Sequence, residues 1–142
     1  MAFPMVSEAS PHLLILGLGY AGQAIARAAL ARGIAVQGTH RQPGQAADTS
    51  PIPVIPFDEA GPAIAAATHL VVTAPPGEDG DPVLARHGAA LRAGLEARLR
   101  WVGYLSTTGV YGDRSGAWVD EATPPAPGQP RSLRRRQAEQ AW

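Results

Sequence analysis

The sequence contains no cysteine and no excess of charge of either sign. Without cysteine among its 142 residues, the chain can form no disulfide framework, no thiolate metal site and no cysteine nucleophile. Its 12 basic and 12 acidic side chains give a formal net charge of zero. Proteins that bind nucleic acids or membrane surfaces usually carry a net basic charge. We therefore expect neither a nucleic acid nor a membrane as a partner.

Long hydrophobic runs are also missing. Every apolar run falls far short of the ~20 residues that a transmembrane helix needs. Residues 1–10 lack the basic start and the apolar centre of a signal peptide. The chain is long enough for one domain with a hydrophobic core, and its 16 glycines and 14 prolines fall between the apolar runs, as in loops. A cytoplasmic protein without internal repeats is the expectation.

The most informative stretch is residues 11–33, PHLLILGLGYAGQAIARAALARG. Its short apolar run, residues 12–16, is typical of a strand that is buried on both faces. An alanine-rich segment that ends near Gly33 predicts a helix with this glycine at its C-terminal cap. Between strand and helix lies a G-x-G-x-x-G motif, which consists of Gly17, Leu18, Gly19, Tyr20, Ala21 and Gly22.

Each glycine of this motif has a role that depends on the absence of a side chain. Gly17 allows a tight turn off the strand, Gly19 lets the backbone approach a pyrophosphate, and Gly22 lets the helix pack closely on the strand. The helix directs unpaired N–H groups and about half a positive charge toward the phosphates. Because strand, turn and helix follow in the required order, residues 17–22 are predicted to bind a dinucleotide. The alternative is a glycine-rich turn without a ligand.

A second strand, predicted at residues 34–38, ends where the adenosine ribose of such a ligand would lie. Sites that prefer NAD usually place an acidic residue there, to bind the 2′-hydroxyl. This chain instead has Thr39, His40 and Arg41, and no acidic residue before Asp48. A guanidinium and a hydroxyl favour a 2′-phosphate. We therefore expect NADP as the cofactor and NAD as the second choice, with a solvated Arg41 as the alternative interpretation.

The rest of the chain alternates strands and helices. Strands are predicted at residues 52–57, 69–73 and 101–105, and a short helix at residues 62–67. This alternation predicts an α/β fold, a doubly wound parallel sheet with helices on both faces and the strand order 3-2-1-4-5. Because proline donates no ladder hydrogen bond, Pro53 and Pro56 favour an edge position for the third strand.

Two of the predicted loops border the expected cofactor. Asp58 follows the third strand, and we expect it either to contact the adenine or to cap the next turn. Ala74 and Pro75 follow the fourth strand, which lies beside the first in this fold, so we expect them at the cofactor unless they form a plain turn.

A long amphipathic helix is predicted to begin at Asp81 and Pro82, as an N-cap and a first-turn proline. Gly88 and Gly94 interrupt it and indicate close packing, which makes the helix at residues 82–99 a candidate homodimer surface. Its apolar stripe, at steps of three and four residues, consists of Val83, Leu84, His87, Leu91, Leu95 and Leu99. No second ligand stands at helical spacing from His87, so we expect a packed histidine and no metal site.

Residues 106–113, STTGVYGD, follow the fifth predicted strand. Here the sequence resembles the extended branch of the short-chain dehydrogenase/reductase superfamily, the NAD-dependent epimerases and dehydratases with their atypical relatives. The resemblance continues through Asp120-Glu121, the proline-rich residues 124–130 and Ala138-Glu139, and covers nearly the whole chain. It implies that residues 1–142 form a Rossmann domain that lacks the substrate-binding lobe of relatives about twice as long. A fragment, or a reduced paralogue with a partner, is the expectation.

The resemblance also implies catalytic roles. Thr107 would donate a hydrogen bond to the substrate oxygen, on which charge develops during hydride transfer, unless it bonds only its local turn. The family's tyrosine and lysine are replaced by Arg131 and Arg135, and arginine cannot shuttle a proton. Arg135 could still hold the nicotinamide ribose, unless this arginine run is only a solvated helix start. The substitutes considered for the missing proton donor are Tyr111, Asp113 and Asp81.

These observations favour an NAD(P)-dependent oxidoreductase or epimerase/dehydratase that acts on a carbonyl or hydroxyl group of a small, nucleotide-sugar-like molecule. The catalytic residues expected are Thr107, Tyr111 and Arg135. One alternative is a non-catalytic NADP-binding sensor or scaffold, because the tyrosine and lysine are missing. Another is an enzyme that uses the glycine turn for the phosphate of coenzyme A.

Overall fold

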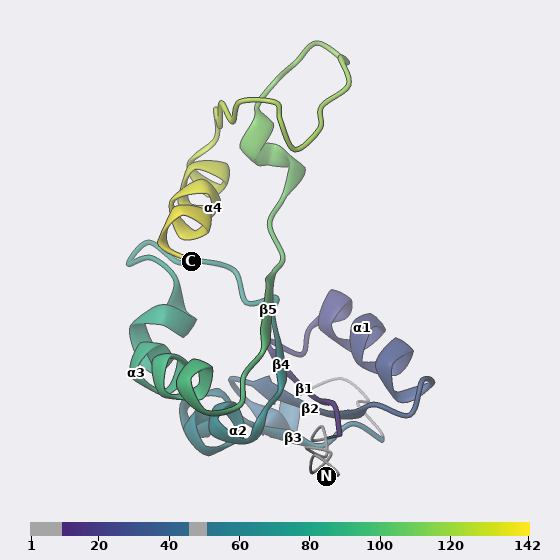
Figure 1. The fold of residues 1–142 in the computed structure, drawn as a ribbon. Helices are drawn as coiled ribbons and strands as arrows, with labels where there is room; N and C mark the ends of the chain where they lie inside the picture. The colour runs from purple at the N-terminus through teal and green to yellow at the C-terminus, as the bar shows by residue number, and fades with distance from the viewer. Residues whose placement is uncertain (1–9, 46–50) are drawn as a thin grey trace, which may run out of the picture.

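The computed structural model describes residues 10–45 and 51–142, and its centre is a five-stranded sheet (Figure 1). The strands run in the order β3-β2-β1-β4-β5, and all neighbours are parallel. This confirms the predicted doubly wound order. The strands are β1 (His12–Leu16), β2 (Ala35–His40), β3 (Val54–Pro56), β4 (His69–Val72) and β5 (Trp101–Tyr104). The helices are α1 (Tyr20–Leu30), α2 (Gly61–Ala66), α3 (Pro82–Ala97) and α4 (Pro130–Ala141).

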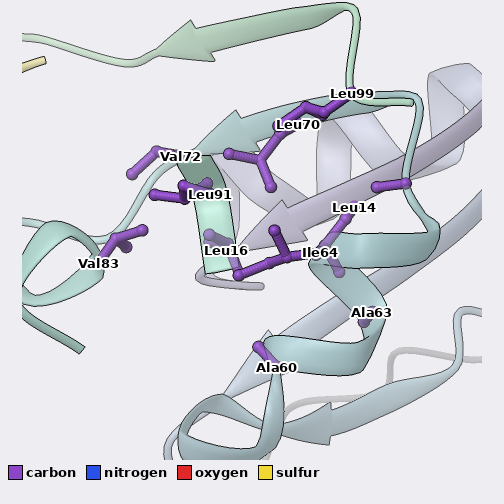
Figure 2. Packing of buried hydrophobic residues seen from close by; sticks show 11 residues of the cluster. Leu14, Leu16, Ala60, Ala63, Ile64, Leu70, Val72, Val83, Leu91 and Leu99 are labelled. Carbon is purple, nitrogen blue, oxygen red and sulfur yellow. The ribbon is translucent and has the colours of Figure 1, made fainter. Parts of the chain in front are cut away.

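Two hydrophobic clusters cover the two faces of the sheet, so its central strand, β1, is buried on both sides. Leu14 and Leu16 of β1 pack with α2 and α3, beside Leu70 and Val72 of β4 (Figure 2). The alternate residues Leu13 and Ile15 pack with α1 on the other face. A strand in this position needs a continuous apolar run, because successive side chains point to opposite faces and both are buried.

Single residues account for the C-terminal end of α1 and for the edge position of β3. Gly33 has a φ of +72°, and the amides of Gly33 and Ile34 donate to the carbonyls of Leu30 and Ala29, at 2.9 and 3.1 Å. This is the predicted glycine cap, which closes the helix with a left-handed residue. β3 lies at the sheet edge, as its prolines predicted.

Several predicted boundaries were wrong by one or two residues. β2 continues to His40, so Thr39 is a strand residue rather than the start of a loop. β3 covers only Val54–Pro56, because the chain turns into a 3-10 helix at Phe57–Glu59. β4 and β5 each end one residue early, and the predicted short helix begins at Gly61. Another 3-10 turn, Pro43–Gln45, follows β2. Residues 46–50, including Asp48, lie outside the described residues.

Helix α3 begins as predicted, and its buried stripe differs from the prediction at one position. The Oδ1 atom of Asp81 accepts hydrogen bonds from the amides of Val83 and Leu84, each at 2.9 Å. Leu95 is 58% exposed, so its place in the predicted stripe was wrong. Gly94 faces α2 instead, and a Cβ there would lie 3.5 Å from the carbonyl oxygen of Ile64. Helices α2 and α3 thus contact each other at Gly94, and the next residue, Leu95, points toward solvent.

His87 is the packed residue that the sequence predicted. It is 5% exposed, and its Nε2 atom forms a hydrogen bond with the carbonyl oxygen of Phe57 at 2.8 Å. Within residues 10–45 and 51–142, no three histidine, aspartate or glutamate side chains gather in a way that could hold a metal ion. None of the helices described there has the length and hydropathy of a membrane span.

The first prediction concerns the cap of α3. Asp81→Ala removes both amide acceptors and the Oδ2 atom that accepts from Nε1 of Trp142 at 3.1 Å. We expect the free energy of unfolding to fall by about 1–3 kcal/mol, measured by urea denaturation. Asp79→Ala, an exposed aspartate of the same loop, is the control and should change stability by less than about 0.5 kcal/mol. Equal effects of the two variants would refute the assigned role.

Candidate functional site

The glycine turn between β1 and α1 leaves no room for side chains at its two ends. Gly17 has a φ of +105°, and a Cβ there would lie 2.8 Å from both the Ala74 amide nitrogen and the Thr73 Oγ1 atom. A Cβ at Gly22 would lie 2.5 Å from the Gly17 carbonyl oxygen. Such contacts are far inside van der Waals distance, so both positions require glycine. The turn is therefore pressed against β4 on one side and its own helix on the other.

Gly19, in the middle of the turn, lies in open space. A Cβ there would meet no atom within 4 Å, although the backbone φ of −85° is one that any residue adopts. Gly19 is the N-cap residue of α1 and is exposed, as are Tyr20 and Ala21. The first-turn amides of an α-helix have no partner within the helix. This helix end therefore carries free donors beside an open space that a side chain at position 19 would fill.

A hollow of about 420 Å³ adjoins this helix end. It lies where the carboxyl ends of β1, β2 and β4 meet, the usual binding region of an open parallel sheet. Its lining residues are Gly17, Leu18, Gly19, Tyr20, Ala21, Gly22, Thr39, His40, Arg41, Phe57, Thr73, Ala74, Pro75, Gly77 and Pro82.

Nearly all of the predicted cofactor residues line this hollow. The glycine turn, Thr39, Arg41, Ala74 and Pro75 come together there from separate parts of the chain. Asp58 does not line it, and its carboxylate instead lies 3.3 Å from the Nε atom of Arg86, where both side chains are exposed. Phe57 and Thr73, which directly follow β3 and β4, also line the hollow and were not predicted from the sequence. Their positions at strand ends were the signal that could have identified them.

Two threonine hydroxyls hold Gly17 in place. The Oγ1 atom of Thr39 accepts a hydrogen bond from the Gly17 amide at 3.1 Å, and the Thr73 hydroxyl donates to the Gly17 carbonyl oxygen. The Thr39 side chain is completely buried. Thr39 therefore fixes the turn, whereas Arg41 is exposed at the β2 end of the hollow.

The hydroxyl cluster after β5 lies outside this hollow. Thr107 is the N-cap residue of a short 3-10 helix, Thr108–Tyr111, and its hydroxyl accepts from the Gly109 amide at 3.3 Å. The Ser106 hydroxyl donates to Oε1 of Glu139 on α4. The 3-10 helix and α4 stand together beyond the carboxyl end of β5 (Figure 1).

A second, smaller hollow lies between these two elements. Its volume is about 300 Å³, and it contains Tyr111, one of the predicted catalytic residues. It is lined by Val110, Tyr111, Glu121, Thr123, Pro125, Arg136 and Glu139. Asp113 is engaged elsewhere, since its Oδ1 atom accepts from the Ser115 amide at 2.8 Å.

The arginines of α4 differ in their surroundings. Arg131 is exposed. Arg135 is half-buried, and its Nη1 atom donates to the carbonyl oxygen of Leu105 at 2.8 Å and to the Tyr104 hydroxyl at 3.3 Å. Arg136 pairs with Oε2 of Glu139 at 2.9 Å. Arg135 therefore attaches α4 to the end of β5, whereas the Arg136 pair lies within the helix.

Comparisons with known proteins give matches among solved structures. No protein-family model and no curated protein matches the chain. A conserved protein of unknown function from Silicibacter pomeroyi is 42% identical, with a TM-score of 0.82 over 93% of this chain and 47% of that one. A protein described as an NAD-dependent epimerase/dehydratase from Methylobacillus flagellatus is 26% identical, with a TM-score of 0.68 over 94% and 50%.

A third match is a short-chain dehydrogenase/reductase superfamily protein from Agrobacterium tumefaciens, with bound NAD. It is 19% identical, with a TM-score of 0.66 over 91% of this chain and 43% of that one. The chain spans about half the length of each of these proteins. The Methylobacillus flagellatus protein thus agrees with the resemblance to NAD-dependent epimerases and dehydratases, and the Agrobacterium tumefaciens protein shares the fold.

Proposed function

We propose that the chain binds a nicotinamide dinucleotide, NADP before NAD, in the hollow at the glycine turn. One observation carries this proposal. A Cβ atom at Gly17 or Gly22 would collide with protein atoms, whereas the Cβ position of Gly19 is open. Packing alone explains the first two glycines but not the third. A ligand that approaches the backbone at Gly19 explains it, and the adjacent helix end favours an anionic one. The bound NAD of the Agrobacterium tumefaciens protein supports this choice of ligand.

The residues around the hollow fit the parts of such a ligand. The amides of Tyr20, Ala21 and Gly22 would bind the pyrophosphate, while Ala74 and Pro75 border it. Arg41 would bind the 2′-phosphate that distinguishes NADP from NAD. Because the Thr39 hydroxyl already accepts from Gly17, this residue would act by holding the turn.

The activity we propose is that of an oxidoreductase or epimerase acting on a carbonyl or hydroxyl group of a small molecule. The dinucleotide would supply or accept the hydride. Thr107, which follows β5 by three residues, would donate a hydrogen bond to the substrate oxygen and stabilise its developing charge. A non-catalytic dinucleotide sensor is the second candidate, because an exposed Arg131 stands where the resemblance expects the catalytic tyrosine.

The second prediction tests the open position in the turn. Gly19→Val adds a side chain where no protein atom lies within 4 Å, so we expect an unchanged melting temperature. The same side chain would occupy the path of the pyrophosphate, so NADPH affinity should fall at least about tenfold, or about 1.4 kcal/mol. Fluorescence titration with NADPH measures this.

The matched control is Gly44→Ala, another glycine with open space at its Cβ position. It should leave both NADPH affinity and melting temperature unchanged. Wild-type affinity in Gly19→Val would remove the glycine turn from the binding site.

The third prediction tests cofactor choice. Arg41→Asp replaces the cation at the β2 end of the hollow with an anion, which repels a 2′-phosphate but can accept from a 2′-hydroxyl. We expect NADPH affinity to fall about 10–100-fold and NADH affinity to change less than about threefold. Arg92→Asp makes the same charge change on an exposed part of α3 and is the control. Equal losses for both cofactors would exclude Arg41 from the site.

The fourth prediction separates an enzyme from a sensor. With a panel of aldehydes, ketones and sugars, we expect the protein to consume NADPH, followed by its fluorescence. A heat-denatured sample is the control for spontaneous oxidation. An epimerase would regenerate its dinucleotide, so the sugars are also checked for conversion to their epimers. Tight NADPH binding with neither NADPH consumption nor epimer formation for any panel member would favour the sensor.

A further inference from the structure

Side chains that can carry a positive charge lie only at the β2 end of the larger hollow. Among the described residues that line it, none is acidic, and the two basic ones are His40 and Arg41. His40 is the last residue of β2 and Arg41 follows it. Arginine is always charged, whereas histidine gains or loses its charge between about pH 5 and 8. The charge of this end of the hollow can therefore change with pH.

His40 is held close to the glycine turn by its neighbour in β2. The hydroxyl of Thr39 accepts from the Gly17 amide at 3.1 Å, and the carbonyl oxygen of Thr39 accepts from the Leu18 amide at 2.7 Å. On the other side, His40 pairs with Pro56 of β3. The backbone of His40 thus has a fixed place between the turn and the edge strand, and its half-buried side chain lines the hollow.

The imidazole ring can take up a proton without leaving its place. Its Nδ1 atom lies 3.0 Å from the amide nitrogen of Gln42 and 2.8 Å from the carbonyl oxygen of the same residue. In the neutral ring, an unprotonated Nδ1 accepts from that amide, and the hydrogen is on Nε2. In the charged ring, Nδ1–H donates to that carbonyl oxygen instead. Nδ1 has a partner in both states, so the charge can change while the ring stays beside the hollow.

The elements around His40 offer few other charges. The glycine turn contributes the phenol of Tyr20 as its titratable group, and β3 contributes none. The carboxylates of Asp58 and Glu59 follow β3, but both are exposed and neither lines the hollow. None of the described carboxylates forms an ion pair with His40. Apart from Arg41, the nearest charge that a protonated His40 can meet is therefore that of a bound ligand.

The 2′-phosphate of NADP is the part of the ligand that responds to such a charge. A phosphate monoester carries close to two negative charges near pH 7, whereas NAD has an uncharged hydroxyl in the same place. A cation nearby stabilises the phosphate strongly and the hydroxyl only slightly. Arg41 would supply a constant positive charge and His40 a variable one.

We propose that His40 is a specificity-determining residue whose protonation strengthens the preference of this site for NADP over NAD. This inference rests on the proposed function. As the pH falls through the histidine range, the imidazole gains a proton, and the affinity for NADP rises relative to that for NAD. As the pH rises, the proton is lost, and the preference falls to the level that Arg41 maintains alone.

The ligand has a titration of its own, which opposes this effect. A phosphate monoester takes up a proton near a pH of about 6 and then carries a single negative charge. The contribution of His40 is therefore clearest between about pH 6 and 8. A variant without the imidazole gives the contribution of the phosphate alone, because the ligand is the same.

The fifth prediction uses the four histidines of the chain as probes. The Cε1 proton of each gives one NMR signal, and His40→Gln identifies the signal of His40. We expect saturating NADP⁺ to raise the midpoint of the His40 titration by about one pH unit relative to saturating NAD⁺, because the phosphate favours the charged ring. His12, at the opposite end of β1, is the internal control and should titrate alike with both ligands.

Binding measurements give the same linkage from the side of the ligand, since coupling between two sites is reciprocal. Between pH 8 and 6, the preference for NADP⁺ over NAD⁺ should rise about three- to tenfold more in the wild type than in His40→Gln. At pH 8, where the imidazole is uncharged, the two proteins should bind NADP⁺ within about threefold of each other. His12→Gln is the control variant and should keep the wild-type pH dependence.

The outcomes distinguish this inference from the function on which it rests. Absence of binding of either dinucleotide would overturn both. Binding with equal His40 midpoints for NADP⁺ and NAD⁺ would overturn the inference and leave the binding site intact. Equal pH dependence of the preference in the wild type and in His40→Gln would assign it to the phosphate alone, and the role of His40 would be refuted.

Discussion

The fixed position of Gly17 is the constraint on which the site depends. Thr39 of β2 accepts its amide, Thr73 beyond β4 donates to its carbonyl, and a φ of +105° allows the sharp turn between them. These contacts tie the end of β1 to both neighbouring strands at the same level. The start of α1 is aimed by this junction, because Gly22 packs directly on the Gly17 carbonyl oxygen. A small shift at Gly17 would therefore redirect the first amides of the helix.

The core explains why this junction is stiff. β1 lies at the centre of the sheet and buries Leu14, Ile15 and Leu16 completely, with α1 on one face and α2 and α3 on the other. Movement of its end would open both clusters, and protein interiors are too closely packed to absorb that. The backbone donors at the helix start are thus held in one position, and a ligand that bound them would lose less entropy.

The sequence predicted the parts of this arrangement that depend on local chemistry. The apolar run of β1, the glycines, the prolines of β3 and the Asp81 cap each follow from a residue and its immediate neighbours, and the structure agrees with them. The contacts of Thr39 and Arg135 could not be predicted in this way. Each depends on a partner far along the chain, Gly17 for Thr39 and Tyr104 for Arg135. Nothing in the spacing of either residue indicates that partner.

Recognition of a dinucleotide and supply of a proton differ in the same way in how far the sequence reveals them. A dinucleotide is bound chiefly by backbone amides, so its recognition requires glycines at fixed spacing and leaves a clear motif in the sequence. A proton donor needs only one side chain near the reacting atoms, and more than one element can supply it. α4 is attached to the rest of the fold through Arg135, Glu139 and Trp142, which contact β5, Ser106 and Asp81. With α4 fixed in this way, Arg135 reaches the Tyr104 hydroxyl on β5, a contact between two elements that the spacing of neither residue reveals.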